Sequence, residues 1–314
     1  MSLTPEARSL LDMIYRVDAP RFHQLGHVQA RHSFQKLQYA FRSPAPAIAS
    51  TVEVPMARAD GSALLGRLYR PLGSIADDVL PLLIFYHGGG WCVGDVPSYD
   101  VLCRQLANAS GCAVLSVDYR LAPEHPFPAA VDDAGFAFAW AQEQADLLGI
   151  DPARIALGGD SAGGSLAIVT ALAVREHDLP AAFLLLIYPS TDIVSKRPSR
   201  QAYQQGYFLD LETLEWFFSR YFPQGGEEDW RASPLRASSL AGLPPICLLA
   251  AEYDPLRDDG QAFATAVREA GGEVEWIEAA GLVHGFITLG KLFPEADEIT
   301  RALGERLGKA LGRR

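Results

Sequence analysis

Ser161 has the clearest chemical signature in the chain, because it stands in the motif GDSAG at positions 159–163. An apolar segment of strand character precedes the motif and an apolar segment of helical character follows it, which is the context of a nucleophile elbow. In such a turn the serine hydroxyl projects from the carboxyl edge of a sheet, and the N–H of Ala162 points towards a developing oxyanion. Asp160 is expected to point away and to support surrounding loops. The motif alone fits equally well a helix N-terminus in which the glycines serve packing.

A second glycine-rich motif, HGGGW at positions 87–91, follows an apolar run upstream of the serine. Consecutive glycines let backbone N–H groups approach a ligand without steric hindrance. We therefore predict an oxyanion hole formed by the N–H groups of Gly89, Gly90 and Ala162, and we leave open which glycines donate. His87 is expected to be structural. A flexible glycine loop is the alternative interpretation.

A serine nucleophile also needs a general base and an acid that orients the base. Asp254 and His284 both follow Ser161 in the chain, and each stands on a loop after a segment of strand character. Open α/β sheets place their sites on such loops, and the order serine, acid, histidine is typical of this class of fold. We predict Ser161 as nucleophile, His284 as base and Asp254 as acid. Asp258 and Glu252 are the alternative acids.

Alternation of apolar runs with helical patterns predicts the elements that must position these residues. Strands are predicted at 51–55, 64–69, 80–86, 113–118, 154–158, 182–188, 245–251 and 273–278. Helices are predicted at 98–109, 132–148, 162–176, 263–270 and 299–311. This alternation favours an α/β fold with a mostly parallel central sheet and helices on both faces.

Two segments lie outside this alternation. Residues 1–48 carry apolar side chains at helical spacing and end in a proline-rich stretch, so they are predicted as an N-terminal helical arm. Residues 191–239 are rich in aromatic side chains and are predicted as an insertion. Together the two segments are expected to form a helical cap over a catalytic domain of residues 49–314.

Five motifs stand in one order along the chain: HGGGW at 87–91, DYRLAPEHPFPAA at 118–130, GDSAGG at 159–164, DPLRDD at 254–259 and HGF at 284–286. In that order and at those separations, the chain resembles the hormone-sensitive-lipase family of carboxylesterases. These are also called the bacterial family IV esterases, and they have the α/β-hydrolase fold. The resemblance covers the chain from about residue 50 to its C-terminus.

The resemblance implies a mechanism through an acyl-enzyme on Ser161, and it supports Asp254 over the alternative acids. It also implies substrates with short to medium acyl chains. A further implication is that Asp118, Arg120 and Glu124 form a buried polar network that holds the oxyanion loop.

Several apolar side chains flank the motif residues or lie in the insertion, and we predict that they line or close the substrate pocket. They are Trp91, Tyr188, Tyr207, Phe208, Leu209, Leu256, Val283 and Phe286. Each of them also fits a place in the hydrophobic core.

Composition excludes several other classes of function. The 314 residues are 49% hydrophobic and 21% charged, with a net charge of −11. Disorder requires a lower hydrophobic content, and binding to nucleic acid or to an anionic membrane surface requires clustered lysine and arginine. The apolar runs are too short to cross a bilayer. We therefore expect a folded protein without a nucleic-acid partner and without membrane insertion.

Metal and redox motifs are missing from the sequence. The four cysteines show neither CxxC spacing nor histidines at zinc-ligand spacing, so we expect reduced thiols in a cytoplasmic protein. The first residues lack the pattern of a secretory signal. His23, His27 and His32 lie close together in the arm, but no HExxH motif or suitably spaced acid accompanies them. We expect no metal and no cofactor.

The sequence therefore predicts a serine carboxylesterase that acts on small, uncharged, fairly apolar esters. Amide hydrolysis, lactone opening and transacylation use the same triad and are alternative reactions. A small-molecule receptor on this fold is a further alternative, although such receptors lack the histidine that is present here as His284. A homodimer that pairs through the strand at 273–278 is possible, as in relatives.

Overall fold

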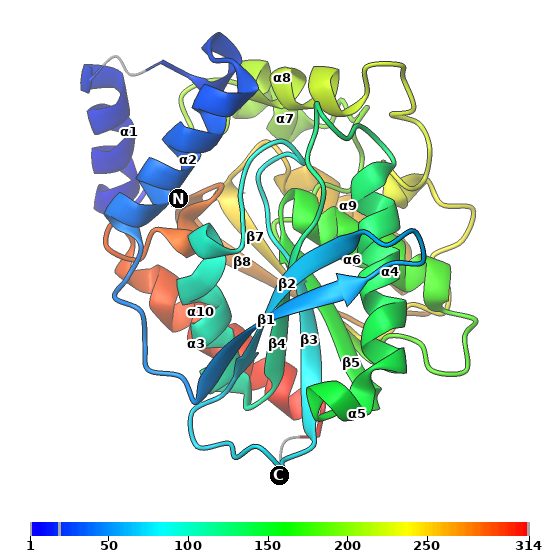
Figure 1. Ribbon diagram of the computed structural model, residues 1–314. Coiled ribbons are helices and arrows are strands. Elements are labelled where there is room, and N and C mark those ends of the chain that lie inside the picture. The colour runs from blue at the N-terminus through cyan, green and yellow to red at the C-terminus, as the bar shows by residue number, and fades with distance from the viewer. Residues whose placement is uncertain (1, 18–19, 313–314) are drawn as a thin grey trace.

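The computed structural model describes residues 2–17 and 20–312, and its centre is one eight-stranded sheet (Figure 1). The strands are β1 (Ser50–Ala57), β2 (Ala63–Arg70), β3 (Leu80–Tyr86), β4 (Ala113–Asp118), β5 (Ile150–Asp160), β6 (Phe183–Ile187), β7 (Ile246–Tyr253) and β8 (Val274–Val283). Their order across the sheet is β1-β2-β4-β3-β5-β6-β7-β8. The pairs β1–β2 and β2–β4 are antiparallel, and the other pairs are parallel. The predicted α/β fold with a mostly parallel sheet is confirmed.

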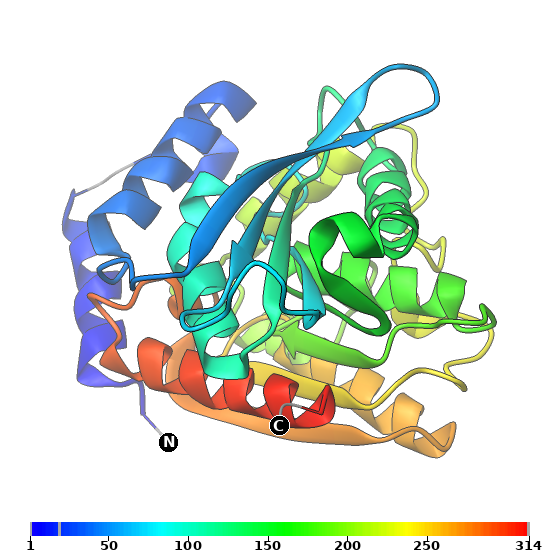
Figure 2. The same ribbon diagram turned by 60° about the horizontal axis from the view of Figure 1, so that its bottom comes forward.

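Helices cover both faces of this sheet (Figures 1 and 2). The helices are α1 (Pro5–Val17), α2 (His27–Phe41), α3 (Asp100–Ser110), α4 (Ala129–Glu143), α5 (Ala145–Leu148), α6 (Ala162–Val174), α7 (Pro198–Ala202), α8 (Leu211–Tyr221), α9 (Arg257–Glu269) and α10 (Pro294–Ala310). Buried side chains of α4, α6 and α9 belong to one hydrophobic core, and those of α3 and α10 belong to a second.

Strand β3 shows why the sheet separates two cores. Leu82 and Ile84 belong to the first core, whereas Leu83 and Phe85 belong to the second. Successive side chains of a strand point to opposite faces, so a strand covered on both sides must be apolar throughout. Strands with this composition appear in the sequence as continuous apolar runs.

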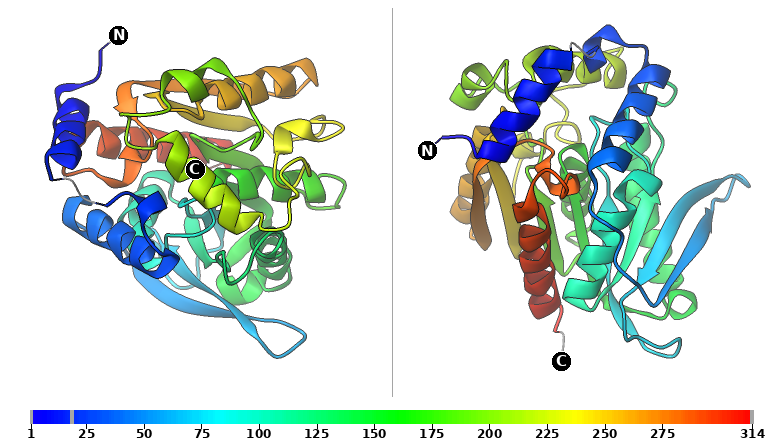
Figure 3. Two further views of the ribbon diagram at one scale, coloured as in Figure 1. Left: turned by 90° about the horizontal axis from the view of Figure 1, so that it is seen from above. Right: turned by 90° about the vertical axis from the view of Figure 1, so that its left-hand side faces the viewer.

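The N-terminal arm and the insertion contact one another at the end of the sheet where β5, β7 and β8 finish. α2 and α8 both lie over this side of the molecule in the view from above (Figure 3). The indole nitrogen of Trp216 donates to the carbonyl oxygen of Leu25 at 3.2 Å. The rings of Phe22 and Phe217 lie 6.2 Å apart. These contacts join two segments that are far apart in the sequence.

Several predicted boundaries differ from the structure. Helix α9 begins at Arg257 rather than 263, and its first turn contains Asp258 and Asp259, whose charges suit the helix dipole. Helix α10 begins at Pro294 rather than 299, and proline fits a first helical turn because the missing N–H is not needed there. The helix predicted at 132–148 is divided into α4 and α5.

Candidate active site

A sharp turn between β5 and α6 carries Ser161. Its backbone has φ 53° and ψ −118°, a conformation that non-glycine residues rarely adopt. The Ser161 N–H donates to the carbonyl oxygen of Ile187 at 2.9 Å, which ties the turn to the end of β6. A Cβ on Gly163 would collide with the carbonyl oxygen of Tyr86. Glycine is therefore required at this position of the motif, where helix and strand approach closely.

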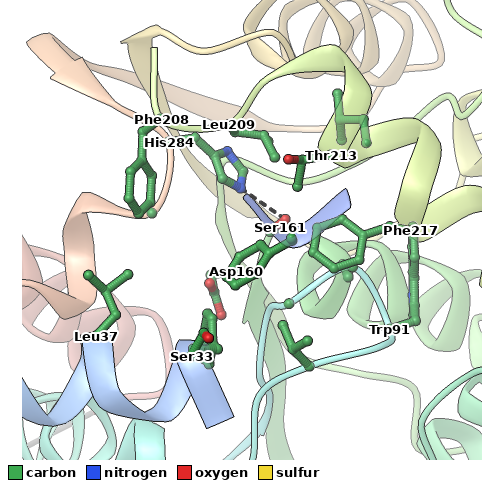
Figure 4. A pocket seen from close by; sticks show the side chains of 18 of the residues that line it. Ser33, Leu37, Trp91, Asp160, Ser161, Phe208, Leu209, Thr213, Phe217 and His284 are labelled. Atoms are coloured by element: carbon green, nitrogen blue, oxygen red, sulfur yellow. Dashed lines mark hydrogen bonds between the residues drawn. The ribbon is translucent and has the colours of Figure 1, made fainter. Parts of the chain in front are cut away.

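His284 connects the serine to a buried carboxylate. Its Nε2 lies 3.0 Å from Ser161 Oγ, and its Nδ1 lies 2.6 Å from Asp254 Oδ2 (Figure 4, which draws the contact to Ser161). Asp254 is fully buried, and its other oxygen accepts a hydrogen bond from the N–H of Leu256 at 2.8 Å. A carboxylate held in this way fixes the imidazole ring so that Nε2 faces the hydroxyl.

Loops after three strands of one half of the sheet bring these residues together. Ser161 follows β5, Asp254 follows β7 and His284 follows β8. Strand β8 runs to Val283, beyond the predicted limit of 278, and it thereby delivers His284 to the edge of the sheet. The arrangement can pass a proton from the serine hydroxyl to the imidazole.

The two alternative acids have other partners. Glu252 accepts a hydrogen bond from the N–H of Gly281 at 2.7 Å. Asp258 accepts one from the N–H of Ser199 at 2.9 Å. Both carboxylates therefore hold neighbouring loops, and Asp254 is the carboxylate in contact with His284.

The glycine loop after β3 has an unusual backbone. Gly89 and Gly90 have φ values of 115° and 57°, in the region that favours glycine. A Cβ on Gly89 would collide with the backbone of Val93, and one on Gly90 with the ring of Phe217. Both glycines line the same pocket as Ser161 and Ala162.

Asp160 holds this loop in place through hydrogen bonds. Its carboxylate accepts hydrogen bonds from the Gly88 N–H at 2.7 Å and from the Tyr99 hydroxyl at 3.0 Å. Burial raises the pKa of Asp160 to about 6, although both hydrogen bonds oppose the shift. His87 is also buried in the loop. Its ring stacks on Tyr119 at 4.3 Å between centroids, and burial lowers its pKa.

The raised pKa of Asp160 predicts a specific pH dependence of stability. The folded state binds this proton more tightly than the unfolded state, so the carboxyl stabilises the fold most at low pH and loses that contribution as pH rises from about 4 to about 6. The loss is expected to be about 3 kcal/mol, given ~1.4 kcal/mol for each pKa unit. Urea unfolding of wild type and Asp160→Asn from about pH 3.5 to about pH 7.5 measures it. The stability of wild type relative to the variant should fall as pH rises, and a constant difference would contradict the assignment.

The prediction that Asp118, Arg120 and Glu124 form one buried polar network is wrong. Asp118 is exposed at the end of β4. Arg120 pairs with Asp133 at 2.7 Å, and Glu124 pairs with Arg31 of α2 at 2.6 Å. The three predicted residues therefore do not form one network, and the partners Asp133 and Arg31 lie outside the motif at 118–130.

Asp133 is the buried centre of the real network. Its side chain is fully buried and accepts hydrogen bonds from both Arg120 and Arg58. Burial opposes ionisation, but these hydrogen bonds outweigh it and lower the pKa of Asp133. The pair of arginines ties α4 to the loops after β1 and β4, at the side of the oxyanion loop.

A pocket of about 240 Å³ opens at Ser161 and His284 (Figure 4). Trp91, Phe208, Leu209 and Leu256 line it. The other predicted pocket residues, Tyr188, Val283, Phe286 and Tyr207, are not among its lining residues in the described part of the chain.

Those residues do not reach the pocket because they pack behind or beside the catalytic loops. The ring of Tyr188 lies 4.6 Å from the His284 ring and 5.9 Å from Phe286, and all three side chains are buried. Tyr207 stacks on Tyr253 at 5.5 Å. Tyr188 supports the histidine, and Tyr207 supports the insertion.

Helices α2 and α8 provide lining residues that the sequence analysis missed. From α2 come Ser33, Phe34, Leu37 and Gln38, and from α8 come Thr213, Leu214, Phe217 and Phe218. Residues three and four apart share one face of a helix, so this spacing was the signal available in the sequence.

Two of the three histidines of the arm each contact a single carboxylate. His23 Nε2 lies 3.1 Å from Glu212, and His27 Nε2 lies 3.3 Å from Glu124. Within residues 2–17 and 20–312, no group of three or more potential ligand side chains is arranged to hold a metal ion. No helix of the same ranges has the length and apolar character needed to cross a bilayer.

Comparison with known proteins agrees with this geometry. A sequence profile of the family described as alpha/beta hydrolase fold matches residues 83–288. The ethyl acetate hydrolase of Pseudomonas putida is 38% identical over 308 residues, which cover 95% of this chain and 96% of that protein. This chain belongs to the hormone-sensitive-lipase family of α/β-hydrolases.

Other members of the family align along almost the whole of this α/β-hydrolase. The arylesterase of Saccharolobus solfataricus is 34% identical over 291 residues, covering 91% of this chain and 93% of that protein. An ester-hydrolase from the metagenome of Lake Arreo, solved in complex with a bipyridine phosphonate derivative, is 40% identical. It superimposes with a TM-score of 0.94 and covers 99% of each chain. The similarity therefore includes the N-terminal arm and the insertion.

Proposed function

We propose that this serine esterase hydrolyses small, uncharged esters with short to medium acyl chains through an acyl-enzyme on Ser161. The observation that carries the proposal is the hydrogen-bonded series Asp254–His284–Ser161 at the base of an apolar pocket. Such a series supplies an activated nucleophile, and the pocket supplies a place for an apolar ester.

The first half of the reaction forms the acyl-enzyme. Ser161 Oγ bonds to the ester carbonyl carbon while its proton passes to His284 Nε2. The carbonyl π electrons move to the oxygen, and the N–H groups of Gly89, Gly90 and Ala162 stabilise that negative charge. When the intermediate collapses, the bond to the alcohol oxygen breaks and His284 returns the proton to the leaving alcohol.

The second half regenerates the serine. Water gives a proton to His284 Nε2 while its oxygen bonds to the acyl carbon. Collapse of this second intermediate breaks the bond to Ser161 Oγ, which takes the proton back, and the carboxylic acid leaves. Asp254 stabilises the cationic imidazole in both halves without itself accepting a proton.

The size of the pocket supports a preference for small substrates. Its volume of about 240 Å³ is slightly smaller than the ~300 Å³ at which the range for small-molecule sites begins. Initial rates on p-nitrophenyl esters from acetate to palmitate measure this preference. We expect kcat/KM to be greatest at butyrate or hexanoate and to fall at longer chains, because a pocket of this size cannot enclose many further methylene groups. Faster hydrolysis of palmitate than of hexanoate would contradict the proposal.

We also propose that residues 1–48 and 191–239 act together as a cap over the catalytic domain of residues 49–314. The proposal is supported by the lining residues that α2 and α8 contribute to one pocket and by the contacts of Trp216 with Leu25 and of Phe22 with Phe217. A cap of this kind would limit the access of bulk water to the pocket while the ester is bound.

Two properties of the whole protein are proposed on narrower grounds. Strand β8 forms one edge of the sheet, so its outer side is available for pairing with β8 of a second copy in a homodimer. The four cysteines are buried thiols, which supports a reducing, cytoplasmic location.

A further inference from the structure

The face that α2 turns to the pocket combines apolar and polar side chains. Ser33, Phe34, Leu37 and Gln38 line the pocket, and the spacing of one and four residues places them along one face of the helix. Ser33 and Leu37 point into the pocket from α2, on the side opposite Phe217 of α8 (Figure 4).

Gln38 is the unusual member of this face. It is 3% exposed, and its side-chain oxygen is buried with no hydrogen-bond partner in the described part of the chain. A buried carboxamide oxygen without a partner is unfavourable, because its hydrogen bonds to water are lost and nothing replaces them.

A neighbouring glutamine on the same helix shows the usual arrangement. Gln35 lies outside the pocket, and its amide nitrogen donates to Asp95 Oδ2 at 2.5 Å. Gln35 thus has a structural partner within the protein. The side-chain oxygen of Gln38, in contrast, has no hydrogen-bond partner in the described part of the chain. The difference suggests that the partner of Gln38 arrives with the substrate.

The chemistry of the carboxamide and of its surroundings limits what that partner is. A carboxamide offers a donor and an acceptor from one planar group, so it binds an uncharged hydroxyl or amide equally well. The pocket also contains the buried carboxyl of Asp160, which disfavours an anionic substrate group. An uncharged polar group is the class that fits both residues.

We propose that Gln38 is a specificity-determining residue that hydrogen-bonds an uncharged hydroxyl or amide carried by the ester, away from the scissile carbonyl. This inference rests on the proposed esterase function and names its substrate class as esters with a second, polar function. Plain alkyl esters bind in the same pocket but leave the Gln38 carboxamide without a partner.

Two pairs of substrates test the proposal, one for each side of the ester bond. In the first pair, p-nitrophenyl 6-hydroxyhexanoate is compared with p-nitrophenyl heptanoate. In the second, 4-hydroxybutyl acetate is compared with pentyl acetate. Each pair differs only by a hydroxyl in place of a methyl group, and the readout is the ratio of the two kcat/KM values.

In wild type, the ratio should favour the hydroxylated member of at least one pair, and Gln38→Leu should lower that ratio about tenfold. Gln35→Leu is the matched control on the same helix and should leave the ratio unchanged. The melting temperature of Gln38→Leu should equal or exceed that of wild type, because the variant removes an unpartnered buried polar group. Gln38→Met provides a second, more flexible apolar replacement if the leucine variant does not fold.

An unchanged ratio in both pairs for the Gln38 variants would overturn the inference, as would an equal fall in Gln35→Leu. An unchanged ratio with a lowered melting temperature would instead assign Gln38 a structural role. These outcomes are distinct from failure of the proposed function, which would appear as the absence of Ser161-dependent hydrolysis of p-nitrophenyl acetate in wild type.

Discussion

Replacing Ser161 with alanine is expected to lower kcat on p-nitrophenyl butyrate by a factor on the order of 10⁵ to 10⁶. The Oγ atom, 3.0 Å from His284 Nε2, is the atom that forms the covalent bond, and alanine has nothing to replace it. The remaining activity would come from binding and from the glycine N–H groups, which still act on a direct attack by water. Steady-state rates at saturating ester measure the change.

Ser165→Ala is the matched control for this variant. Ser165 is buried in α6, one turn beyond Ser161, and does not line the pocket. It should retain kcat within a few fold, so that a loss confined to Ser161→Ala identifies the nucleophile. Comparable activity in Ser161→Ala and wild type would refute the assignment of the nucleophile.

Replacing Asp254 with asparagine is expected to lower kcat by a factor on the order of 10⁴, with a smaller change in KM. The carboxylate accepts a hydrogen bond from His284 Nδ1 and so holds the proton on that nitrogen and leaves Nε2 free to act as base. Asparagine fills the same fully buried space, but its amide group favours the opposite tautomer of the histidine. The measurement is again kcat and KM on p-nitrophenyl butyrate.

Asp258→Asn serves as the control, because Asp258 bonds to the backbone of Ser199 and does not contact the histidine. It should retain kcat within a few fold. If Asp258→Asn lost the larger share of activity, the acid of the site would be Asp258, and the role assigned to Asp254 would be wrong.

The central sheet and the positions of the chemical residues could be predicted because their signals are local. Strands buried on both faces appear as continuous apolar runs, as in β3 and β6. The close approach of α6 to β3 requires glycine at position 163. The loops that carry Asp254 and His284 each follow a strand that is predicted from the sequence. Once parallel strands are assigned, their carboxyl ends must meet at one edge of the sheet.

The pocket walls could not be predicted with the same success, because they depend on contacts between distant segments. Gln38 and Ser161 are separated by more than a hundred positions, and nothing in the sequence of α2 specifies which element its polar face meets. Tyr188 follows β6 and Phe286 belongs to the HGF motif, yet Tyr188 packs against the rings of His284 and Phe286. Both side chains therefore pack around the histidine and do not line the pocket.

The polar network failed for a related reason. Arg120 has two acidic neighbours in sequence, Asp118 and Glu124, but its partner is Asp133 on the next helix. A buried carboxylate is stable only where several donors converge on it, and Asp133 receives both Arg120 and Arg58. That convergence is set by the packing of α4 against two loops, which the sequence alone does not specify.

The most direct test of the account is covalent labelling of the full-length protein with a fluorophosphonate, read by intact mass and by peptide mapping. The phosphorus forms a bond to the activated serine oxygen and fluoride leaves, so the reaction reports on nucleophile and base together. We predict one adduct per chain, located on Ser161, with no adduct in Ser161→Ala and much slower labelling in Asp254→Asn. Labelling of a different residue, or no labelling of folded wild-type protein, would contradict the account.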